Sequence, residues 1–378
     1  MTSPPRILTI AGSDSSGGAG IQADIKTITM LGGYAMSAIT AVTAQNTKGV
    51  QAVHILPAEL VAAQIDACVG DIGVDAVKIG MLGSPEIAAI VASRLERLEV
   101  PIVFDPVMVA TSGAALADGP TRAAFAALMR CAMVTTPNLP ELAALGGEAA
   151  VLADCEALLI KGGHGAGAML IDRLVTREGE AARWEAPPID TPHTHGTGCT
   201  LASAVAMGLG QGLALVPAID RARRFVRLAL RDAPGLGGGH GPLGHAAVRL
   251  DLGGDIRFNQ ITLPACDYAA SVAFYRGLGL TQIVDSPGNG YARFECPGGA
   301  TLSVALDHAT PGGAAAYFEC DDLDAALTAL AAGGIAAALP IDQTWLWREA
   351  WLTDPAGNRI CLYQAGENRR HPPWRLSG

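Results

Sequence analysis

A chain of 378 residues is longer than a single compact core requires, so its length predicts two domains. Half of the residues are apolar and 16% are charged, a composition that excludes an intrinsically disordered chain. The formal net charge of −10 is shared by both parts of the chain, which excludes a nucleic-acid binder.

The aromatic residues change in frequency along the chain. Thirteen of them follow residue 255, whereas only five precede it: Tyr34, Phe104, Phe125, Trp184 and Phe225. The glycine-rich segment 234–254 lies at this step and has the composition of a domain end and a linker. We therefore predict a domain at 1–250, a linker at 251–255, a second domain at 256–366 and a tail at 367–378.

The cysteines and the apolar segments bear on the location of the protein. Eight cysteines are scattered without a CxxC pair, which indicates neither a zinc knuckle nor a disulfide framework and leads us to expect a reducing, cytoplasmic setting. The apolar run near the N-terminus is too short for a signal peptide. The uncharged segment 199–219 is interrupted by glycines and Pro217, so a buried helix is favoured over a membrane span.

Before residue 250, short apolar runs alternate with longer amphipathic stretches. The runs predict buried parallel strands at 7–10, 76–79, 102–104, 133–135 and 158–160. The amphipathic stretches predict helices at 58–69, 85–98 and 120–130. This alternation is typical of an open α/β sheet with helices on both faces.

Ligands of such sheets bind beyond the C-terminal ends of the strands. The residues that directly follow predicted strands are Gly12, Met81, Asp105, Asn138 and Lys161. Asp105 and the nearby Glu141 are oxygen donors suited to Mg²⁺ held partly through water, and Lys161 can act as a point charge on a phosphate. Each carboxylate could instead be a capping or turn residue, but together these groups match the needs of phosphoryl transfer.

Two glycine-rich segments have different meanings. Segment 12–19 has the glycine spacing of a phosphate loop but lacks its Lys and Ser/Thr, so a Walker-type site is excluded and a tight turn explains Gly12 equally well. Segment 195–200, HGTGCT, opens a predicted helix of small residues. Backbone N–H groups at such a helix start form an anion site.

Seven collinear motifs between residues 5 and 248 resemble the hydroxymethylpyrimidine and phosphomethylpyrimidine kinases of thiamine biosynthesis. They are IAGSD (10–14), GGAGIQAD (17–24), AQNT (44–47), KIGML (78–82), TPNLPE (136–141), KGGH (161–164) and HGTGCT (195–200). The resemblance implies a ribokinase-like fold. It also implies MgATP-dependent phosphorylation of 4-amino-5-hydroxymethyl-2-methylpyrimidine and then of its monophosphate.

The resemblance also implies roles for individual residues. The pyrimidine pocket would be lined by Gly12, Asp24, Gln45, Met81 and Val107. Mg²⁺ would be held by Asp105 and Glu141, and the ATP phosphates by Asn138, Lys161 and Thr197. The anion hole would be formed by Gly196, Thr197, Gly198 and Cys199.

Cys199 stands where many sugar-kinase relatives have an Asp base. A thiol at a helix N-terminus can have a lowered pKa, so Cys199 could accept the proton of the substrate hydroxyl. Holding that hydroxyl in position is an equally compatible role.

The chain departs from the family pattern in two places. Thr111 stands where the family usually has a Lys before Ser-Gly, which puts the second phosphorylation in more doubt than the first. Only nineteen residues separate Glu141 from Lys161, so we expect that a helix and possibly a strand have been trimmed on the nucleotide side.

Residues 256–366 have a different pattern. Half-buried alternation predicts strands at 258–263, 290–295, 300–305, 314–319, 350–353 and 359–364, and helices at 268–278 and 323–332. The order of a helix and several strands occurs twice, as an internal repeat of roughly 55 residues.

This region resembles the vicinal-oxygen-chelate superfamily of glyoxalases, extradiol dioxygenases and bleomycin-resistance proteins. The motifs are SVAFY (271–275) with LGL (278–280), FECDDL (318–323) and DPAGNR (354–359). The resemblance implies an α+β domain of paired βαβββ modules, whose metal positions fall on Gln260, Ser303, Ala315 and Cys361. None of these is a good ligand for a hard metal, so we expect a metal-free domain for binding or assembly.

The tryptophans of this region could serve either purpose. Trp345, Trp347 and Trp351 share a parity, so they could line a cleft with Tyr291 and Arg293. Packing in the core or in a dimer is the alternative, and a homodimer is expected by analogy only.

The main hypothesis is therefore a cytoplasmic pyrimidine kinase with a small-molecule substrate and no membrane partner. A pyridoxine or pyridoxal kinase is the nearest rival, because that group shares the fold and much of the pocket. A ligand-binding sensor with a degenerate kinase domain is the alternative from another class.

Overall fold

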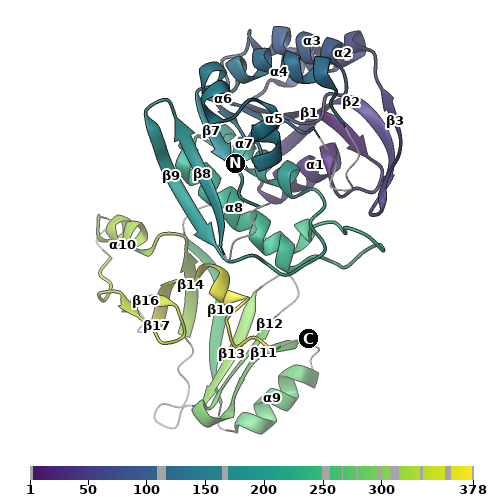
Figure 1. Ribbon diagram of the computed structural model, residues 1–378. Helices are drawn as coiled ribbons and strands as arrows, with labels where there is room; N and C mark the ends of the chain where they lie inside the picture. Colours follow the sequence, from purple (N-terminus) through teal and green to yellow (C-terminus); the bar gives the residue numbers. More distant parts are fainter. Residues whose placement is uncertain are drawn as a thin grey trace. The chain divides into compact units, whose positions relative to one another are not determined.

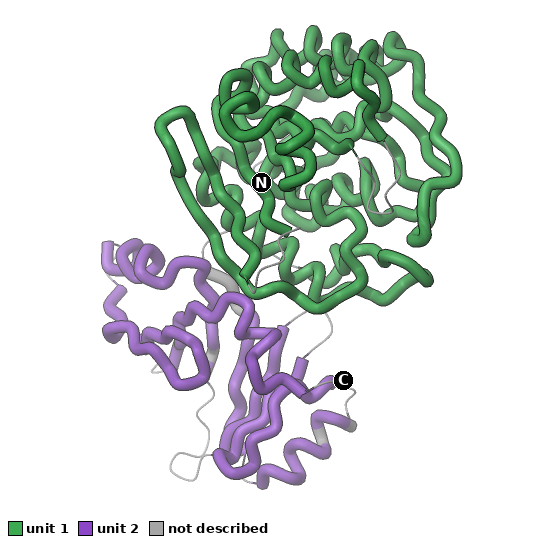
Figure 2. The backbone as a smooth tube through the Cα atoms, in the orientation of Figure 1, with its two compact units in different colours: residues 1–250 green, residues 251–378 purple. Residues whose placement is uncertain are grey.

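The computed structural model describes residues 3–108, 116–163, 169–248, 256–265, 267–277, 280–295, 300–306, 315–332, 335–353 and 359–376 (Figure 1). The chain divides into two compact units, Met1–Leu250 and Asp251–Gly378 (Figure 2). The expected linker at 251–255 lies outside the described residues.

The first unit contains a nine-stranded sheet in the order β3-β2-β1-β4-β5-β6-β7-β8-β9. The six central strands β2, β1, β4, β5, β6 and β7 run parallel to one another. The edge strands pair antiparallel: β3 with β2, β8 with β7, and β9 with β8. Their bounds are β1 (Arg6–Asp14), β2 (Tyr34–Asn46), β3 (Gly49–Ile55), β4 (Ala76–Ile79), β5 (Ile102–Phe104), β6 (Val134–Thr135), β7 (Ala157–Ile160), β8 (Leu170–Thr176) and β9 (Gly179–Ala186).

Helices cover both faces of this sheet. One layer consists of α1 (Gly20–Met30), α7 (Thr197–Gly210) and α8 (Leu215–Arg231). The other consists of α2 (Ala58–Ala67), α3 (Pro85–Leu95), α4 (Gly119–Cys131) and α6 (Glu148–Asp154) (Figure 1). The short α5 (Leu139–Ala144) follows β6, a π-helix at Cys68–Ile72 extends α2, and a 3-10 helix lies at His245–Ala247.

The structure confirms the open α/β architecture. The five predicted parallel strands are β1 and β4 to β7, and the three predicted helices are α2, α3 and α4. The uncharged segment 199–219 forms most of α7, in which Thr200 to Leu209 are all buried, and the first residues of α8. The patterns did not predict β2, β3, β8 or β9, because the largely exposed edge strands β3 and β9 lack the continuous apolar run of a buried strand.

The second unit contains two βαβββ modules, as expected. The first has β10 (Ile256–Ala265), α9 (Tyr268–Gly277), β11 (Thr281–Ser286), β12 (Tyr291–Glu295) and β13 (Thr301–Leu306). The second has β14 (Ala315–Cys320), α10 (Leu323–Ala332), β15 (Ile341–Asp342), β16 (Arg348–Thr353) and β17 (Arg359–Gln364). Their strands form one sheet in the order β11-β12-β13-β10-β14-β17-β16-β15. Only β11 and β15 were not predicted.

The two faces of this second sheet differ in chemistry. Ala292 and Phe294 of β12 pack in the cluster that includes residues of α9. The alternating residues Tyr291 and Arg293 contact polar and aromatic groups instead. A 3-10 helix at Gly366–Arg369 follows β17, and beyond it Arg370 pairs with Glu295 at 2.6 Å.

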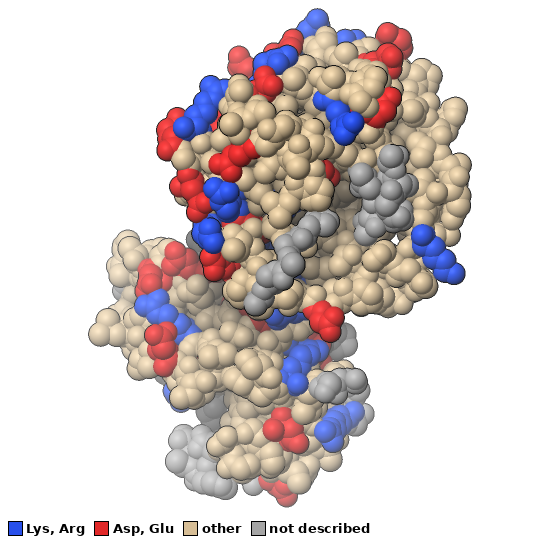
Figure 3. All heavy atoms as spheres, viewed as in Figure 1, with Lys and Arg blue, Asp and Glu red and all other residues tan. Residues whose placement is uncertain are grey.

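On the face seen in Figure 3, acidic and basic side chains are interspersed over both units. Among the described residues, no helix is both long and apolar enough to cross a membrane.

Candidate active site

A cavity of about 1340 Å³ lies beyond the C-terminal ends of the parallel strands of the first unit. Every predicted site residue except Asp24 lines it: Gly12, Gln45, Met81, Asp105, Val107, Asn138, Glu141, Lys161, Gly196, Thr197, Gly198 and Cys199. Segments up to 187 residues apart in the chain, from Gly12 to Cys199, therefore meet in one space.

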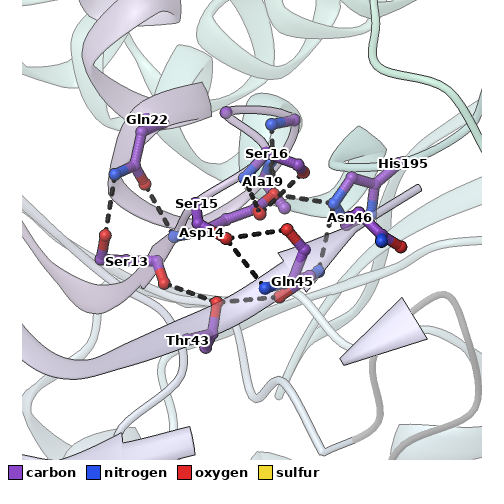
Figure 4. A network of polar contacts seen from close by, with 12 residues as sticks. Ser13, Asp14, Ser15, Ser16, Ala19, Gln22, Thr43, Gln45, Asn46 and His195 are labelled. Carbon is purple, nitrogen blue, oxygen red and sulfur yellow. Dashed lines mark hydrogen bonds and ion pairs between the residues drawn. The ribbon is translucent and has the colours of Figure 1, made fainter. Parts of the chain in front are cut away.

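One wall of the cavity combines a thioether with an amide. A Cβ on Gly12 would stand 3.0 Å from Sδ of Met81, so the glycine leaves room for the methionine. The backbone of Gln45 is held by the hydroxyl of Ser15 at 2.8 Å, and its Oε1 accepts from Thr43 Oγ1 at 3.2 Å (Figure 4). The wall thus offers an adaptable apolar surface beside a fixed amide.

Asp24 does not line the cavity, which corrects the expectation for this residue. Its side chain is fully buried and accepts hydrogen bonds from Lys78 Nζ at 2.9 Å, Ser203 Oγ at 2.7 Å and Thr9 Oγ1 at 2.5 Å. The motif that contains Asp24 forms the start of α1, and the helix turns this residue toward the sheet. Its carboxylate therefore lies behind the cavity wall and does not face the cavity.

A compact charged cluster occupies the opposite part of the cavity. Lys161 Nζ donates to Asp105 Oδ1 at 2.7 Å and lies 4.0 Å from Glu141 Oε2. Asp105 also accepts from Thr136 Oγ1 at 3.0 Å. Asn138 and Glu141 form a capping box at the start of α5, with reciprocal 2.8 Å bonds.

The charges of this cluster shift the pKa values of Lys161 and Glu141. Burial would lower the pKa of Lys161, but the carboxylates of Asp105 and Glu141 outweigh this effect and raise it, so the ammonium group is charged at neutral pH. Burial raises the pKa of Glu141, Lys161 opposes the rise, and the charge of Asp105 adds to it. Two crowded carboxylates of this kind form a site that a divalent cation would stabilise.

The start of α7 faces the same cluster. Gly196 caps the helix with φ +87°, in the left-handed region that favours glycine. A Cβ on Gly198 would stand 3.4 Å from both Asp105 Oδ2 and Lys161 Nζ, so the backbone of the first turn approaches these groups closely. The N–H of Thr197 donates to the carbonyl oxygen of Thr194 at 3.3 Å, and the backbone N–H groups that follow at the first turn of a helix are suited to an anion.

Cys199 does not have the lowered pKa that the sequence suggested. Burial raises the pKa of its thiol to about 11, against the opposing effect of Lys78. Desolvation is therefore the largest effect on the pKa of this thiol. At neutral pH Cys199 is a protonated thiol, so it does not serve as the base through a standing thiolate.

The structure adds site residues that sequence reasoning did not single out. Asp14 and His195 line the cavity and are paired at 2.8 Å, although both lay within the recognised motifs. Three arginines, Arg122, Arg223 and Arg227, also line it. The strongly amphipathic, arginine-rich sequence of α8 was the available signal for the last two.

The two departures from the family pattern have different outcomes. Thr111 lies outside the described residues. The nineteen residues between Glu141 and Lys161 hold the end of α5, all of α6 and β7. Because β7 pairs with both β6 and β8, the sheet is continuous across this short segment.

In the second unit, the expected metal positions lie within a polar and aromatic network. Gln260 donates to Ser303 Oγ at 3.2 Å, and Cys361 is buried against aromatic rings. Ala315 is buried and offers no donor atom for a metal. Among the described residues, no group of three or more His, Cys, Asp and Glu side chains is arranged to hold a metal ion.

The three tryptophans do not share one environment. Trp347 is buried, stacks on Tyr363 at 4.3 Å and carries the Arg293 guanidinium 4.4 Å from its ring centre. Trp351 packs beside it, whereas Trp345 is 40% exposed. Core packing therefore describes Trp347 better than the wall of an open cleft.

The comparisons with known proteins identify the families that the two units resemble. Residues 14–244 match the family model described as phosphomethylpyrimidine kinase, and residues 257–362 match the glyoxalase/bleomycin resistance protein/dioxygenase superfamily. A hydroxymethylpyrimidine/phosphomethylpyrimidine kinase from Streptomyces coelicolor is 48% identical over 257 residues, which cover 64% of this chain and 94% of the relative.

Two solved structures share the fold of the first unit. An ADP complex of Bacillus subtilis pyridoxal kinase has a TM-score of 0.61 at 34% identity and covers 66% of this chain and all of its own. A phosphomethylpyrimidine kinase from Clostridium difficile has a TM-score of 0.52 at 37% identity and covers 59% of this chain and 98% of its own.

The fold and the site thus define a small-molecule kinase with the ribokinase-like architecture. More specifically, the chain belongs to the phosphomethylpyrimidine kinase family, and it carries a C-terminal domain of the glyoxalase superfamily.

Proposed function

We propose that this protein transfers the γ-phosphoryl group of ATP to 4-amino-5-hydroxymethyl-2-methylpyrimidine, and then phosphorylates the monophosphate, in thiamine biosynthesis or salvage. One observation carries the proposal. A single cavity joins the wall of Gln45 and Met81 to the cluster of Asp105, Glu141 and Lys161. The 48% identity to a hydroxymethylpyrimidine/phosphomethylpyrimidine kinase supports the choice of substrate.

The pyrimidine would lie against the first wall. Gln45 offers an amide that can donate to a ring nitrogen or accept from the amino group, while Met81 and Val107 supply apolar contact. Gly12 keeps this wall close to the sheet because no side chain intervenes.

The phosphates would lie between Lys161, Asn138 and the start of α7, where Gly196 to Cys199 present backbone N–H groups. Asp105 and Glu141 fit Mg²⁺, which proteins commonly hold with one or two carboxylates together with substrate phosphates and water. When bound, Mg²⁺ would neutralise charge on the transferred phosphoryl group.

Cys199 would hold the substrate hydroxyl rather than deprotonate it. Its thiol is neutral at pH 7, and phosphoryl transfer through a loose transition state needs positioning more than a strong base. Once the bond from the hydroxyl oxygen to phosphorus has formed, the hydroxyl proton would pass to an anionic oxygen of the transferred phosphoryl group.

A coupled assay of ADP release tests the proposal. The purified full chain is given MgATP with hydroxymethylpyrimidine, with its monophosphate and with pyridoxal. We expect turnover with both pyrimidines. If one of the two pyrimidines is not phosphorylated, that step of the proposal is contradicted. The Asp105→Asn variant controls for contaminating kinases.

Pyridoxal phosphorylation is the second candidate. The likeness to the Bacillus subtilis pyridoxal kinase, with a TM-score of 0.61, favours it. Preference for pyridoxal in the same assay would replace the pyrimidine proposal. Failure of all three substrates, with retained ligand binding, would favour the sensor interpretation.

The described cysteines are all free thiols, which is compatible with the reducing, cytoplasmic location expected from the sequence.

For the second unit, we propose a metal-free role in binding or assembly. Light scattering of the full chain tests the expected homodimer, and elemental analysis of the purified protein tests the metal-free state. A monomer in solution would contradict the expected homodimer. One equivalent of Fe or Zn bound to this unit would contradict the metal-free role.

A further inference from the structure

His195 connects segments that are far apart in the sequence. Its Nε2 lies 2.8 Å from Asp14 Oδ2 and 3.2 Å from the amide nitrogen of Gln45. Its backbone N–H donates to the carbonyl oxygen of Gly241 at 3.2 Å. The side chain is only 6% exposed, and the residue lines the cavity. Figure 4 shows the imidazole directed toward Asp14 and Gln45. The roles proposed above make no use of this imidazole.

Asp14 organises the loop that leads into α1. Its carboxylate accepts from the backbone N–H groups of Ser16, Gly18 and Ala19 at 2.8, 3.1 and 2.8 Å, and from Ser16 Oγ at 2.7 Å. Because a carboxylate only accepts, Nε2 of His195 carries the proton of the remaining contact and donates it to Asp14, so Nε2 does not accept from the side-chain amide of Gln45. The loop contacts Gln45 instead through Ser15 Oγ, which accepts from the backbone N–H of Gln45 at 2.8 Å. The loop and the imidazole are therefore held by the same two oxygen atoms.

Glycines allow the loops before α1 and α7 to touch. A Cβ on Gly18 would stand 2.4 Å from Cδ2 of His195, so a side chain there would displace the ring. A Cβ on Gly196 would stand 1.9 Å from the carbonyl oxygen of Gly18. The contact between the loops is thus as close as the backbone permits, and it leaves His195 little freedom to move.

His195 directly precedes Gly196, which caps α7. A shift of the imidazole would therefore shift the first N–H groups of the helix relative to the wall at Gln45. These two parts of the cavity would hold the phosphoryl donor and its acceptor, so their separation sets the alignment of the reacting atoms.

We propose that Asp14 and His195 are a positioning pair, which holds the anion site of α7 at a fixed distance from the pyrimidine wall at Gln45. The inference rests on the proposed function, because the distance matters only if a phosphoryl group crosses it. Misplacement of about 1 Å lowers a reaction rate by about 100-fold, whereas each binding surface remains intact. Loss of the pair therefore lowers kcat and leaves both KM values almost unchanged.

The test compares steady-state kinetics of the full-length wild type with four variants. His195→Ala removes the ring, and Asp14→Asn weakens the contact while it keeps the shape of the side chain. His195→Gln restores an N–H donor near the position of Nε2. Ser16→Ala deletes one bond to Asp14 and leaves His195 untouched, so it is the matched control.

We expect kcat to fall by about 100-fold in His195→Ala and by about 10-fold or more in Asp14→Asn, with KM for ATP and pyrimidine within about threefold of wild type. His195→Gln recovers most of kcat, and Ser16→Ala equals wild type. Thermal unfolding of every variant confirms that it is folded during the assay. If His195→Ala is unfolded, Asp14→Asn and His195→Gln decide the question.

An unchanged kcat in Asp14→Asn, a His195→Gln variant as slow as His195→Ala, or a loss confined to KM would overturn the positioning role. Failure of the proposed function is a separate result. It appears in the wild type as absence of turnover with the pyrimidine, and the pair is then tested with pyridoxal if that compound is phosphorylated.

Discussion

The ammonium group of Lys78 on β4 lies 2.9 Å from Oδ2 and 3.0 Å from Oδ1 of Asp24 on α1, and both side chains are fully buried. Burial would lower the pKa of Lys78, but the charge of Asp24 outweighs this effect and raises the pKa, so the ammonium group of Lys78 is charged at neutral pH. The hydroxyl groups of Thr9 and Ser203 complete the network.

Lys78→Met is expected to destabilise the first unit. It leaves the Asp24 carboxylate buried without its cation, and breaking such a pair costs about 3–5 kcal/mol of unfolding free energy. Urea unfolding measures the loss. The double variant Lys78→Met, Asp24→Asn should recover part of it, because the second change removes the uncompensated charge. A Lys78→Met variant as stable as wild type would contradict this account.

Acid should weaken the loop at Asp14. Burial would raise the pKa of this carboxyl from 3.8, but hydrogen bonds from His195 and Ser16 outweigh it and hold the pKa at about 2. A lowered pKa in the folded state gives stability that is complete above about pH 4 and is lost as the pH falls toward 2, by about 2 kcal/mol. The stability difference between wild type and Asp14→Asn should narrow by this amount between pH 5 and pH 2. A difference that is constant with pH would exclude the linkage.

Cys199 should react slowly with electrophiles at neutral pH. Burial raises the pKa of its thiol to about 11, so iodoacetamide should label it slowly at pH 7 and faster above pH 10, as followed by mass spectrometry. Cys199→Ser keeps a small hydroxyl at the same position, and its kcat should stay within about tenfold of wild type. Complete labelling within minutes at pH 7 would indicate a thiolate instead.

Glu141→Gln should separate metal binding from helix capping. The amide oxygen of Gln can still accept from the N–H of Asn138, so the melting temperature should be unchanged. Loss of the charge should raise the Mg²⁺ concentration for half-maximal activity by about tenfold. Asn138→Ala is the contrasting variant, because it removes the cap and should cost about 1 kcal/mol. Unaltered Mg²⁺ dependence in Glu141→Gln would remove Glu141 from the metal site.

Trp347→Ala should destabilise the second unit alone. It removes a buried ring from its stack on Tyr363 and from the Arg293 guanidinium, at a cost of about 3–5 kcal/mol. Calorimetry of the full chain should show one transition lowered and the other unchanged, with kcat equal to wild type. A shift of both transitions would show that the two units unfold together.

The sequence by itself determined the two-part organisation, five of the parallel strands and most of the predicted residues that line the cavity. The apolar runs of β4, β5 and β7 are buried on both faces, so their composition alone distinguishes them from their surroundings. The motifs at strand ends meet because parallel strands place their C-terminal ends at one edge of the sheet. In the second unit, the same local rules predicted all but β11 and β15.

Only the tertiary structure decided what several of these residues do. Asp24 turns away from the cavity because Lys78, distant in the sequence, provides its cation. The pKa of Cys199 depends on burial by neighbouring segments, which helix position alone does not reveal. The pairing of Asp14 with His195 joins residues 181 positions apart. Long-range contacts and desolvation are properties of the folded chain, so local sequence patterns do not contain them.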